Sequence, residues 1–344
     1  MCIRDRFALG DNAEATQTYF DENIKTPSEV GDNGPLDKKP PTGLTVDFLA
    51  CALPTCEQQA GYFAEAVKNL GWTVKTVTFE LSAEGIQKAF NTAIADKPTG
   101  GVVTSGFVKQ AFAQQLAKLK EMGIPVVDYF SGNDAGDGII SAVGNDAILK
   151  FSDNMASWAT VDGGGKANVI EFNVTSFGVQ KIMHDRIEKQ LKGGMCTECE
   201  YTFNDLALTD LGPGLPAKVV SAVQRAPKTT HLIFGFAELT TGVPAALKNA
   251  GLADKVKIIT AGPEQPTFQS IMSGEITAAT AQPLEEQQWC MADALARHAS
   301  GTEVPLVACD LPSQILTKDT VTEAWKVWPG VPDWKDEFLK DWDV

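Results

Sequence analysis

The sequence predicts an α/β protein built from two doubly wound parallel-sheet lobes that are joined by a three-segment hinge. Apolar, strand-like runs alternate with helical stripes along most of the chain, and a strand recurs roughly every 25 to 30 residues. Parallel βαβ units produce this spacing, and their right-handed crossovers place helices on both faces of an open sheet. About ten predicted strands are more than one such sheet usually holds, so the pattern favours two sheets.

The first series of predicted strands starts at Leu44. A helical stripe of apolar residues at steps of three and four follows it and ends at Gly71, as expected where a glycine caps a helix. The predicted strands of this series are the segments 44–50, 72–79, 101–104, 124–127 and 139–143.

A second series follows a break near residues 144–165 and repeats the same alternation. Its predicted strands are the segments 168–172, 201–206, 231–234, 256–260 and 276–280, and a short strand-like segment occurs later at 313–316. The end of the chain is rich in tryptophan. We expect Trp325, Trp328, Trp334 and Trp342 to anchor it by packing, in preference to stacking on a ligand.

Acidic residues dominate the charge of the protein. Asp and Glu number 44 against 29 Lys and Arg, which gives a net charge of -15. A surface of this sign repels nucleic-acid phosphates and anionic lipids, so we expect neither as a partner. It also keeps a protein soluble, and a monomer is expected. No segment approaches the roughly 18 consecutive apolar residues of a membrane helix.

Residues 1–43 are expected to be a linker behind an artefactual start. Met1 to Arg6 resemble translated read-through of a sequencing adapter, and no hydrophobic run of a secretory signal follows them. Residues 7–43 are acidic and rich in turn formers, such as Asp32–Pro35 and Pro40–Pro41. We therefore expect that an export signal is missing from this sequence, and a lipid anchor stays an open alternative.

The cysteines indicate an oxidising compartment. Apart from Cys2, they fall into local pairs, which are Cys51 with Cys56, Cys196 with Cys199, and Cys290 with Cys309. Close pairs in loops fit disulfides, although about 15 connectivities of six cysteines are possible. Reduced core thiols are the alternative. A zinc site is disfavoured because the second pair supplies only two ligands, and a redox motif is disfavoured because that pair precedes a strand.

Motifs of common enzyme classes are missing. The sequence has no G-x-x-x-x-G-K-[ST] loop, no G-x-G-x-x-G between a strand and a helix, no H-E-x-x-H and no G-x-S-x-G. Structural roles are favoured for His184, His231 and His298, which lie far apart on different predicted elements. The glycine-rich loop 132–138 lacks the spacing and the closing Glu of an EF-hand. We therefore expect no enzyme, no cofactor and no metal.

The candidate ligand-binding residues follow the predicted strands. Ligands of open parallel sheets bind beyond the carboxyl ends of the strands, and two lobes facing each other through those loops would form one cleft. The candidates in these loops are Leu53, Asp128, Tyr129, Phe130, Asn173, Phe177, Phe236, Glu238, Glu264 and Gln282. The alternative for the aromatic candidates is that they only fill the interface between the lobes.

From about Leu44 to Thr320, the order of these features resembles the type I periplasmic binding proteins, in the branch of sugar-binding components of ABC importers. The segment Ile276–Pro283 is similar to the point where the family's chain crosses back to the first lobe. Gln282 then stands where ribose binders place a glutamine on the sugar.

Other segments fit the same family, each of them only loosely by itself. They are 48–56, 71–74 and 123–127. The loop Cys51–Cys56, with prolines ahead of it near Pro40, looks like an actinobacterial subgroup.

The resemblance implies a division of the chain and a mechanism. Lobe 1 would comprise residues 44–143 and 282–308, lobe 2 residues 144–281 and 309–325, and a C-terminal tail residues 326–344. The hinges would lie near Val143–Gly144, Ala281–Gln282 and Cys309–Asp310. A small-molecule ligand would bridge the lobes, stabilise the closed form and be delivered to an ABC transporter permease outside the cytoplasm.

Several positions depart from the sugar binders. Leu53 stands where they have Asn, Phe130 where they have Asp, and Met183, Phe236 and Gly262 lie near the places of their Arg, Asn and Asp. A sugar hydroxyl buried without a partner costs about 1 to 3 kcal/mol. We therefore expect a ligand less polar than a pentose or hexose. Its polar groups would be oriented by Asp128, Asn173, Glu264 and Gln282.

Three other functions are alternatives to solute import. A sensor component that presents its ligand to a signalling receptor would have the same sequence features. The effector domain of a repressor would need a basic N-terminal helix-turn-helix, which the acidic residues 7–43 lack. An enzyme on this fold would need a nucleophile and a base that converge, and none is recognisable.

Overall fold

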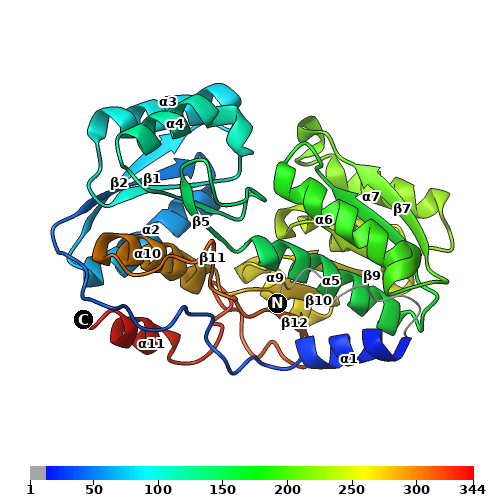
Figure 1. The fold of residues 1–344 in the computed structure, drawn as a ribbon. Coiled ribbons are helices and arrows are strands. Elements are labelled where there is room, and N and C mark those ends of the chain that lie inside the picture. The colour runs from blue at the N-terminus through cyan, green and yellow to red at the C-terminus, as the bar shows by residue number, and fades with distance from the viewer. Residues whose placement is uncertain (1–12) are drawn as a thin grey trace. The chain divides into compact units, whose positions relative to one another are not determined.

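Residues 13–344 are described by a computed structural model, and they form two compact α/β units (Figure 1). The first unit comprises Ser28–Ile148, Pro283–Pro312 and Gly330–Val344. The second comprises the described residues up to Pro27, Leu149–Gln282 and Ser313–Pro329. The segment Met1 to Arg6, with Cys2, lies outside the described residues. The expectation of two parallel-dominated sheets with flanking helices is confirmed.

The sheet of the first unit has the strand order β11-β5-β4-β3-β1-β2. These strands are β1 (Thr45–Cys51), β2 (Thr73–Phe79), β3 (Gly101–Ser105), β4 (Val126–Tyr129), β5 (Ile139–Val143) and β11 (Val307–Ala308). All of their pairings are parallel, so their carboxyl ends meet at one edge of the sheet. The two-residue strand β11 was not predicted.

Helices cover both faces of this sheet. They are α2 (Pro54–Asn69), α3 (Ala83–Asp96), η2 (Lys109–Phe112), α4 (Ala113–Glu121), α10 (Leu284–Ser300) and α11 (Trp334–Asp341). Figure 1 shows α3 and α4 on one face and α2 and α10 on the other. Neighbouring residues of β1 therefore enter different cores: Phe48 packs with α2 and α10, and Leu49 packs with α3 and α4.

The sheet of the second unit has the order β12-β10-β9-β8-β6-β7. Its strands are β6 (Asn168–Asn173), β7 (Glu200–Asp205), β8 (His231–Phe234), β9 (Lys257–Ala261), β10 (Ala278–Ala281) and β12 (Gln314–Thr317). Only β12, which arises from the strand-like segment of the sequence, runs antiparallel to its neighbour.

The helical elements of the second unit flank this sheet. They are α1 (Ala13–Asn23), α5 (Asn145–Asp162, whose first residues belong to the first unit), α6 (Gly178–Lys189), η3 (Gln190–Gly194), η4 (Leu208–Asp210), α7 (Leu215–Arg225), η5 (Ala237–Thr240), α8 (Val243–Asn249), η6 (Ala253–Lys255) and α9 (Gln265–Ser273). None of the helices in residues 13–344 is both long enough and apolar enough to span a membrane.

Helix α1 lies in a segment for which the sequence predicts a linker. Its buried residues are Thr16 and Tyr19, and the Tyr19 hydroxyl donates a hydrogen bond of 2.9 Å to Asn154 Oδ1. Its other apolar residues, Ala13, Ala15 and Phe20, form no helical stripe, so apolar periodicity did not reveal it. The segment is held by a few specific contacts within the second unit.

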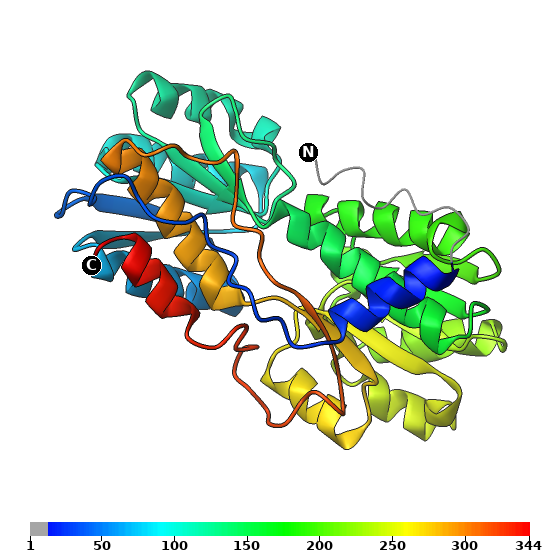
Figure 2. The ribbon, with the colours of Figure 1, turned by 60° about the horizontal axis from the view of Figure 1, so that its bottom comes forward.

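The C-terminal helix α11 packs on α10 through aromatic rings (Figure 2). The Trp289 and Trp342 rings are stacked with their centroids 5.3 Å apart, and Trp334 meets Trp289 edge-on at 5.3 Å. The buried indole of Trp342 donates a 2.9 Å hydrogen bond to Asp293, which also pairs with Arg297 at 2.7 Å. The tail tryptophans of this unit are packing anchors, as expected.

Disulfides join the three local cysteine pairs. Cys51 is bonded to Cys56, Cys196 to Cys199, and Cys290 to Cys309. The last of these links α10 to the segment after β11 within the first unit.

The variant Trp342→Ala should destabilise the first unit by about 3 to 5 kcal/mol, because it opens a cavity beside Trp289 and removes a donor from buried Asp293. Urea unfolding followed by circular dichroism measures the loss. Trp325→Ala, which removes a half-buried ring that meets Phe268 edge-on in the second unit, is the control and should cost less. A loss below about 1 kcal/mol for Trp342→Ala would show that the ring is not the anchor described.

Candidate functional site

The loops that follow the parallel strands gather at one edge of each sheet. In the first unit, three large apolar side chains are exposed in these loops. Leu81 follows β2, Leu53 follows β1 and Val108 follows β3, with exposed fractions of 42%, 47% and 48%. These three strands are neighbours in the sheet, so we call Leu53, Leu81 and Val108 the apolar rim. Single exposed apolar residues are ordinary, but these three form a row at the carboxyl edge of the sheet, where open parallel sheets bind ligands.

The disulfide Cys51–Cys56 shapes the loop that carries Leu53. Leu53 is extended and immediately precedes α2, and its carbonyl accepts a 3.0 Å hydrogen bond from the Cys56 amide. The Ala52 amide donates to the Phe79 carbonyl at 2.9 Å and ties this loop to the end of β2. The Leu53 side chain is therefore held at the edge by a cross-linked turn.

Asp128 lies at the end of β4 inside a polar network. Its Oδ2 atom accepts hydrogen bonds from the Ser131 hydroxyl and, at 2.9 Å, from the Asn133 amide. Asn133 also accepts a hydrogen bond from the Lys109 backbone at 2.8 Å. Burial raises the pKa of Asp128 to about 7. The structure thus places this candidate below the loop surface, where it holds the loop after β4.

The two aromatic candidates of the first unit differ in exposure. Tyr129 is buried, its ring centroid lies 6.1 Å from that of Phe48, and its hydroxyl donates to Gln59 at 2.7 Å. It belongs to the core. Phe130 is half-buried and adopts a left-handed backbone with φ 46°, which turns the chain away from β4. Phe130 is the aromatic candidate that reaches the edge of the sheet.

In the second unit, Asn173 at the end of β6 organises the adjacent loops. Its Nδ2 atom donates to Glu171 Oε1 at 3.1 Å and to the Gln180 carbonyl at 3.2 Å, and its Oδ1 atom accepts from the Val174 amide at 2.8 Å. Both amide hydrogens of this buried side chain are therefore used. Asn173 fixes the turn into α6, and Phe177 lies on that turn.

The loop after β8 approaches the side-chain amide of Asn173 closely at Gly235. A Cβ atom on Gly235 would lie 2.2 Å from Asn173 Oδ1 and 2.5 Å from Gln180 Oε1, so only glycine fits there. The next residue is the half-buried Phe236. The two aromatic candidates of the second unit, Phe177 and Phe236, are thus carried by loops that meet at Asn173, and both pack against one apolar cluster.

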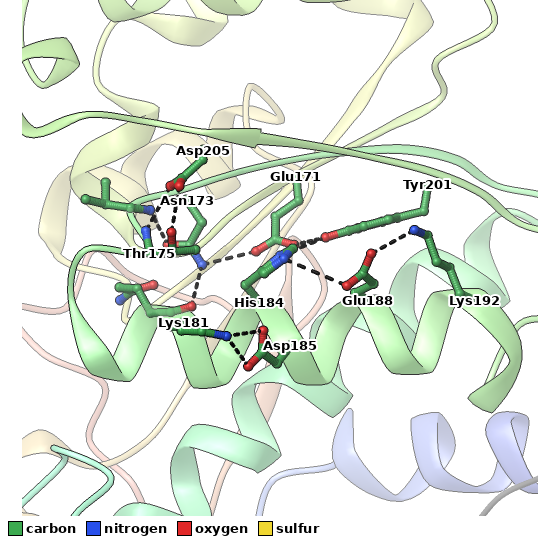
Figure 3. A network of polar contacts seen from close by, with 12 residues as sticks. Glu171, Asn173, Thr175, Lys181, His184, Asp185, Glu188, Lys192, Tyr201 and Asp205 are labelled. Atoms are coloured by element: carbon green, nitrogen blue, oxygen red, sulfur yellow. Dashed lines mark hydrogen bonds and ion pairs between the residues drawn. The ribbon is translucent and has the colours of Figure 1, made fainter.

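The buried carboxylate of Glu171 accepts a hydrogen bond from the Asn173 amide (Figure 3). Glu171 is completely buried, its Oε2 atom lies 3.1 Å from His184 Nδ1, and it accepts a short hydrogen bond from the Tyr201 hydroxyl. The hydrogen bond with Glu171 raises the pKa of His184, against the opposing effect of burial. Burial and the Glu171 carboxylate raise the pKa of Tyr201. Sequence reasoning missed Glu171, because a single acidic residue in an apolar strand has no motif.

The acidic candidates Glu238 and Glu264 line one groove of the second unit. The groove has a volume of about 320 Å³, and its polar lining is Glu238, Thr240, Thr241, Glu264, Thr267, Ser270 and Glu275. Glu264 is half-buried and Glu238 is exposed. Gln282 follows β10 at the same edge, and its Oε1 atom is buried without a hydrogen-bond partner among the described residues. The second unit therefore presents carboxylates, hydroxyls and an amide.

The candidate residues of the two units do not point to a metal or a cofactor. In residues 13–344, no three His, Cys, Asp or Glu side chains are grouped closely enough to hold a metal ion. The three histidines lie on α6, β8 and α10, and two of them, His184 and His231, pair with buried or half-exposed carboxylates.

Two doubly wound units, each with loops gathered at the carboxyl edge of its sheet, form the type of architecture in which such loops bind ligands. The family model of the periplasmic binding protein domain matches residues 55–303, which is more than half of the chain. The chain belongs to this family. No curated protein sequence gives a significant match.

Solved structures share the fold at low sequence identity. A 5-methylthioribose transporter solute-binding protein from Thermotoga lettingae, solved with 5-methylthioribose, is 15% identical with a TM-score of 0.71, over 88% of this chain and 100% of its own. A solute-binding protein from Agrobacterium vitis with bound allitol is 19% identical with a TM-score of 0.70, over 81% and 97%. One from Actinobacillus succinogenes with bound D-allose is 16% identical with a TM-score of 0.71, over 81% and 99%.

Asp128→Asn should flatten the pH dependence of stability. Since the folded-state pKa is raised to about 7, the wild-type stability contributed by Asp128 is largest below the unfolded pKa of about 4 and declines as pH rises to 7. The variant cannot ionise, so its free energy of unfolding should fall by about 2 kcal/mol less between pH 5 and pH 8. Urea unfolding at each pH measures this.

The exposed neighbour Asp134 supplies the control for this experiment. Asp134→Asn should leave the slope of stability against pH as it is in the wild type. An equal slope in Asp128→Asn and wild type would contradict a buried, ionising Asp128.

Proposed function

We propose that the protein captures a small solute outside the cytoplasm and delivers it to the permease of an ABC importer. Membership of the periplasmic binding protein family supports this proposal. So do the structural neighbours, whose descriptions name solute-binding proteins of ABC transporters. In this proposal the ligand is held jointly by the carboxyl-end loops of both units, and capture needs no catalytic group.

The mechanism is closure about the segments that connect the units. The chain passes between the units at Ile148–Leu149, Gln282–Pro283 and Pro312–Ser313, near the three expected hinges, and also at Pro27–Ser28 and Pro329–Gly330. A ligand that contacts both units stabilises the closed form only by the contacts that it makes there and not in the open form. Prolines beside four of these crossings restrict the backbone rotation that closure would use.

We propose further that the ligand is a sugar-like molecule with an apolar substituent. The observation that carries this is the apolar rim, where Leu53, Leu81 and Val108 are exposed in the loops after three neighbouring strands. Covering the exposed half of one such side chain stabilises a complex by about 1 to 1.5 kcal/mol, whereas a hydroxyl buried against it without a partner costs about 1 to 3 kcal/mol.

The second unit would hold the polar part of the same ligand. Glu238, Glu264 and Gln282 offer acceptors and donors for hydroxyl groups at its edge. 5-Methylthioribose, the compound bound by the Thermotoga lettingae neighbour, combines these properties, since it is a pentose that carries a thioether methyl group.

Calorimetric titration with 5-methylthioribose, D-allose and allitol tests this function. We expect 5-methylthioribose to bind most tightly and, at a hundred times its Kd, to stabilise the fold by about 2.7 kcal/mol in thermal unfolding. Equal or tighter binding of D-allose or allitol would contradict the apolar substituent and favour ordinary sugar capture. Failure of all three to bind would count against capture of sugar-like solutes.

The variant Leu53→Asn should weaken binding of 5-methylthioribose roughly tenfold, which corresponds to about 1.4 kcal/mol of lost apolar contact, with less effect on D-allose. Leu306→Asn is the matched control. Leu306 is 68% exposed and directly precedes β11, at the opposite end of the strands from the rim. Equal effects of the two substitutions would remove Leu53 from the site.

A further inference from the structure

The buried carboxylate of Glu171 is not required to build a parallel sheet. It lies in the middle of β6, which pairs with β7 and β8 and is buried on both faces, so apolar residues are usual there. Burying a charge is costly unless it is paired and fully hydrogen-bonded. Glu171 meets this condition through three partners, which are His184, Tyr201 and Asn173 (Figure 3).

One of these partners connects the charge to the candidate ligand loops. Asn173 uses one amide hydrogen on Glu171 and its remaining groups on the backbone of Val174 and Gln180. The loop after β8 passes over the same amide at Gly235. The Glu171 carboxylate therefore helps to hold the Asn173 amide, which bonds the turn that carries Phe177 and lies against the loop that carries Phe236.

We propose that the Glu171–His184 ion pair is a positioning element for the ligand loops of the second unit, so that loss of the His184 proton weakens ligand capture. This inference rests on the proposed function, because Phe177 and Phe236 matter to it as residues of the ligand site.

The charged groups around His184 favour its protonated form. Glu171 faces it from β6, Tyr201 lies 3.0 Å away on β7, and Glu188 on α6 lies 3.9 Å from Nε2. Asp185, also on α6, adds a carboxylate, and the Phe203 ring of β7 stacks on the imidazole at 3.7 Å. Lys181 and Lys192 are occupied by Asp185 and Glu188.

The direction of the effect follows from these contacts. The pKa of His184 is raised, so the imidazolium that neutralises Glu171 is present below this pKa and is lost as pH rises through it. Above it, Glu171 keeps only neutral donors, and its buried charge is less well compensated. The Asn173 amide and the two turns that depend on it are then held less firmly.

Binding of 5-methylthioribose, or of the tightest-binding compound among D-allose and allitol, is measured by calorimetry at pH 6 and pH 9. We expect the wild-type affinity to fall roughly threefold to tenfold at the higher pH. In His184→Gln and Glu171→Gln the affinity should be weak at both values and the pH dependence should be lost. The control His298→Gln, on the last turn of α10 in the first unit, should keep the wild-type pH profile.

Hydrogen exchange of the backbone amides of residues 173–180, without ligand, supplies a second measurement. We expect exchange there, after correction for its intrinsic pH dependence, to rise at high pH in the wild type and to be high at both values in Glu171→Gln. This variant keeps the shape of the side chain, and circular dichroism checks its fold.

The outcomes distinguish failure of this inference from failure of the proposed function. A pH profile of affinity that is unchanged by His184→Gln would overturn the positioning role while leaving solute capture intact. Absence of binding at every pH would overturn the proposed function and the inference together. Exchange at 173–180 that is insensitive to pH and to Glu171→Gln would also overturn the inference.

Discussion

Burial of both faces of each sheet is the constraint on which the rest of the structure depends. Phe48 and Leu49 of β1 enter separate cores, and the same requirement makes β3, β4, β8 and β9 almost continuously buried. Only the edge strands β2 and β7, among the parallel strands of the described residues, are largely exposed. The proposed ligand-binding groups therefore lie in the loops at the carboxyl ends of the strands.

The two units meet this constraint with different chemistry. The edge of the first unit is apolar at Leu53, Leu81 and Val108, and a disulfide fixes one of its turns. The edge of the second unit is polar, and its turns are fixed by Asn173 above a buried carboxylate. A turn that is fixed by a disulfide does not depend on a nearby charge. A turn that is fixed by hydrogen bonds depends on the protonation of the groups that form them. The loops of the two units are thus expected to respond to different conditions.

Much of the fold could be predicted from the sequence because strands buried on both faces and helical stripes give strong periodic signals. Helix α1 could not, since only Thr16 and Tyr19 are buried and its apolar residues form no stripe. Topology alone predicts candidate positions after strands, and in the structure Leu53 is exposed and Phe130 is half-buried. Topology did not distinguish residues that are exposed at the edge of the sheet from residues that are buried below that edge. Asp128, Tyr129 and Asn173 follow or end strands as expected, but their side chains hold neighbouring groups.

The packing of the C-terminal helix on α10 has a consequence for the order in which the protein can fold. The first unit is assembled from three separate stretches of chain, and its core includes Phe48 near one end of the sequence and Trp342 near the other. During synthesis this core stays incomplete until the last turn of α11 has left the ribosome. The chain therefore remains open for longer than a protein with contiguous domains. A polypeptide that must cross a membrane in an unfolded state before it works outside the cytoplasm would benefit from this delay.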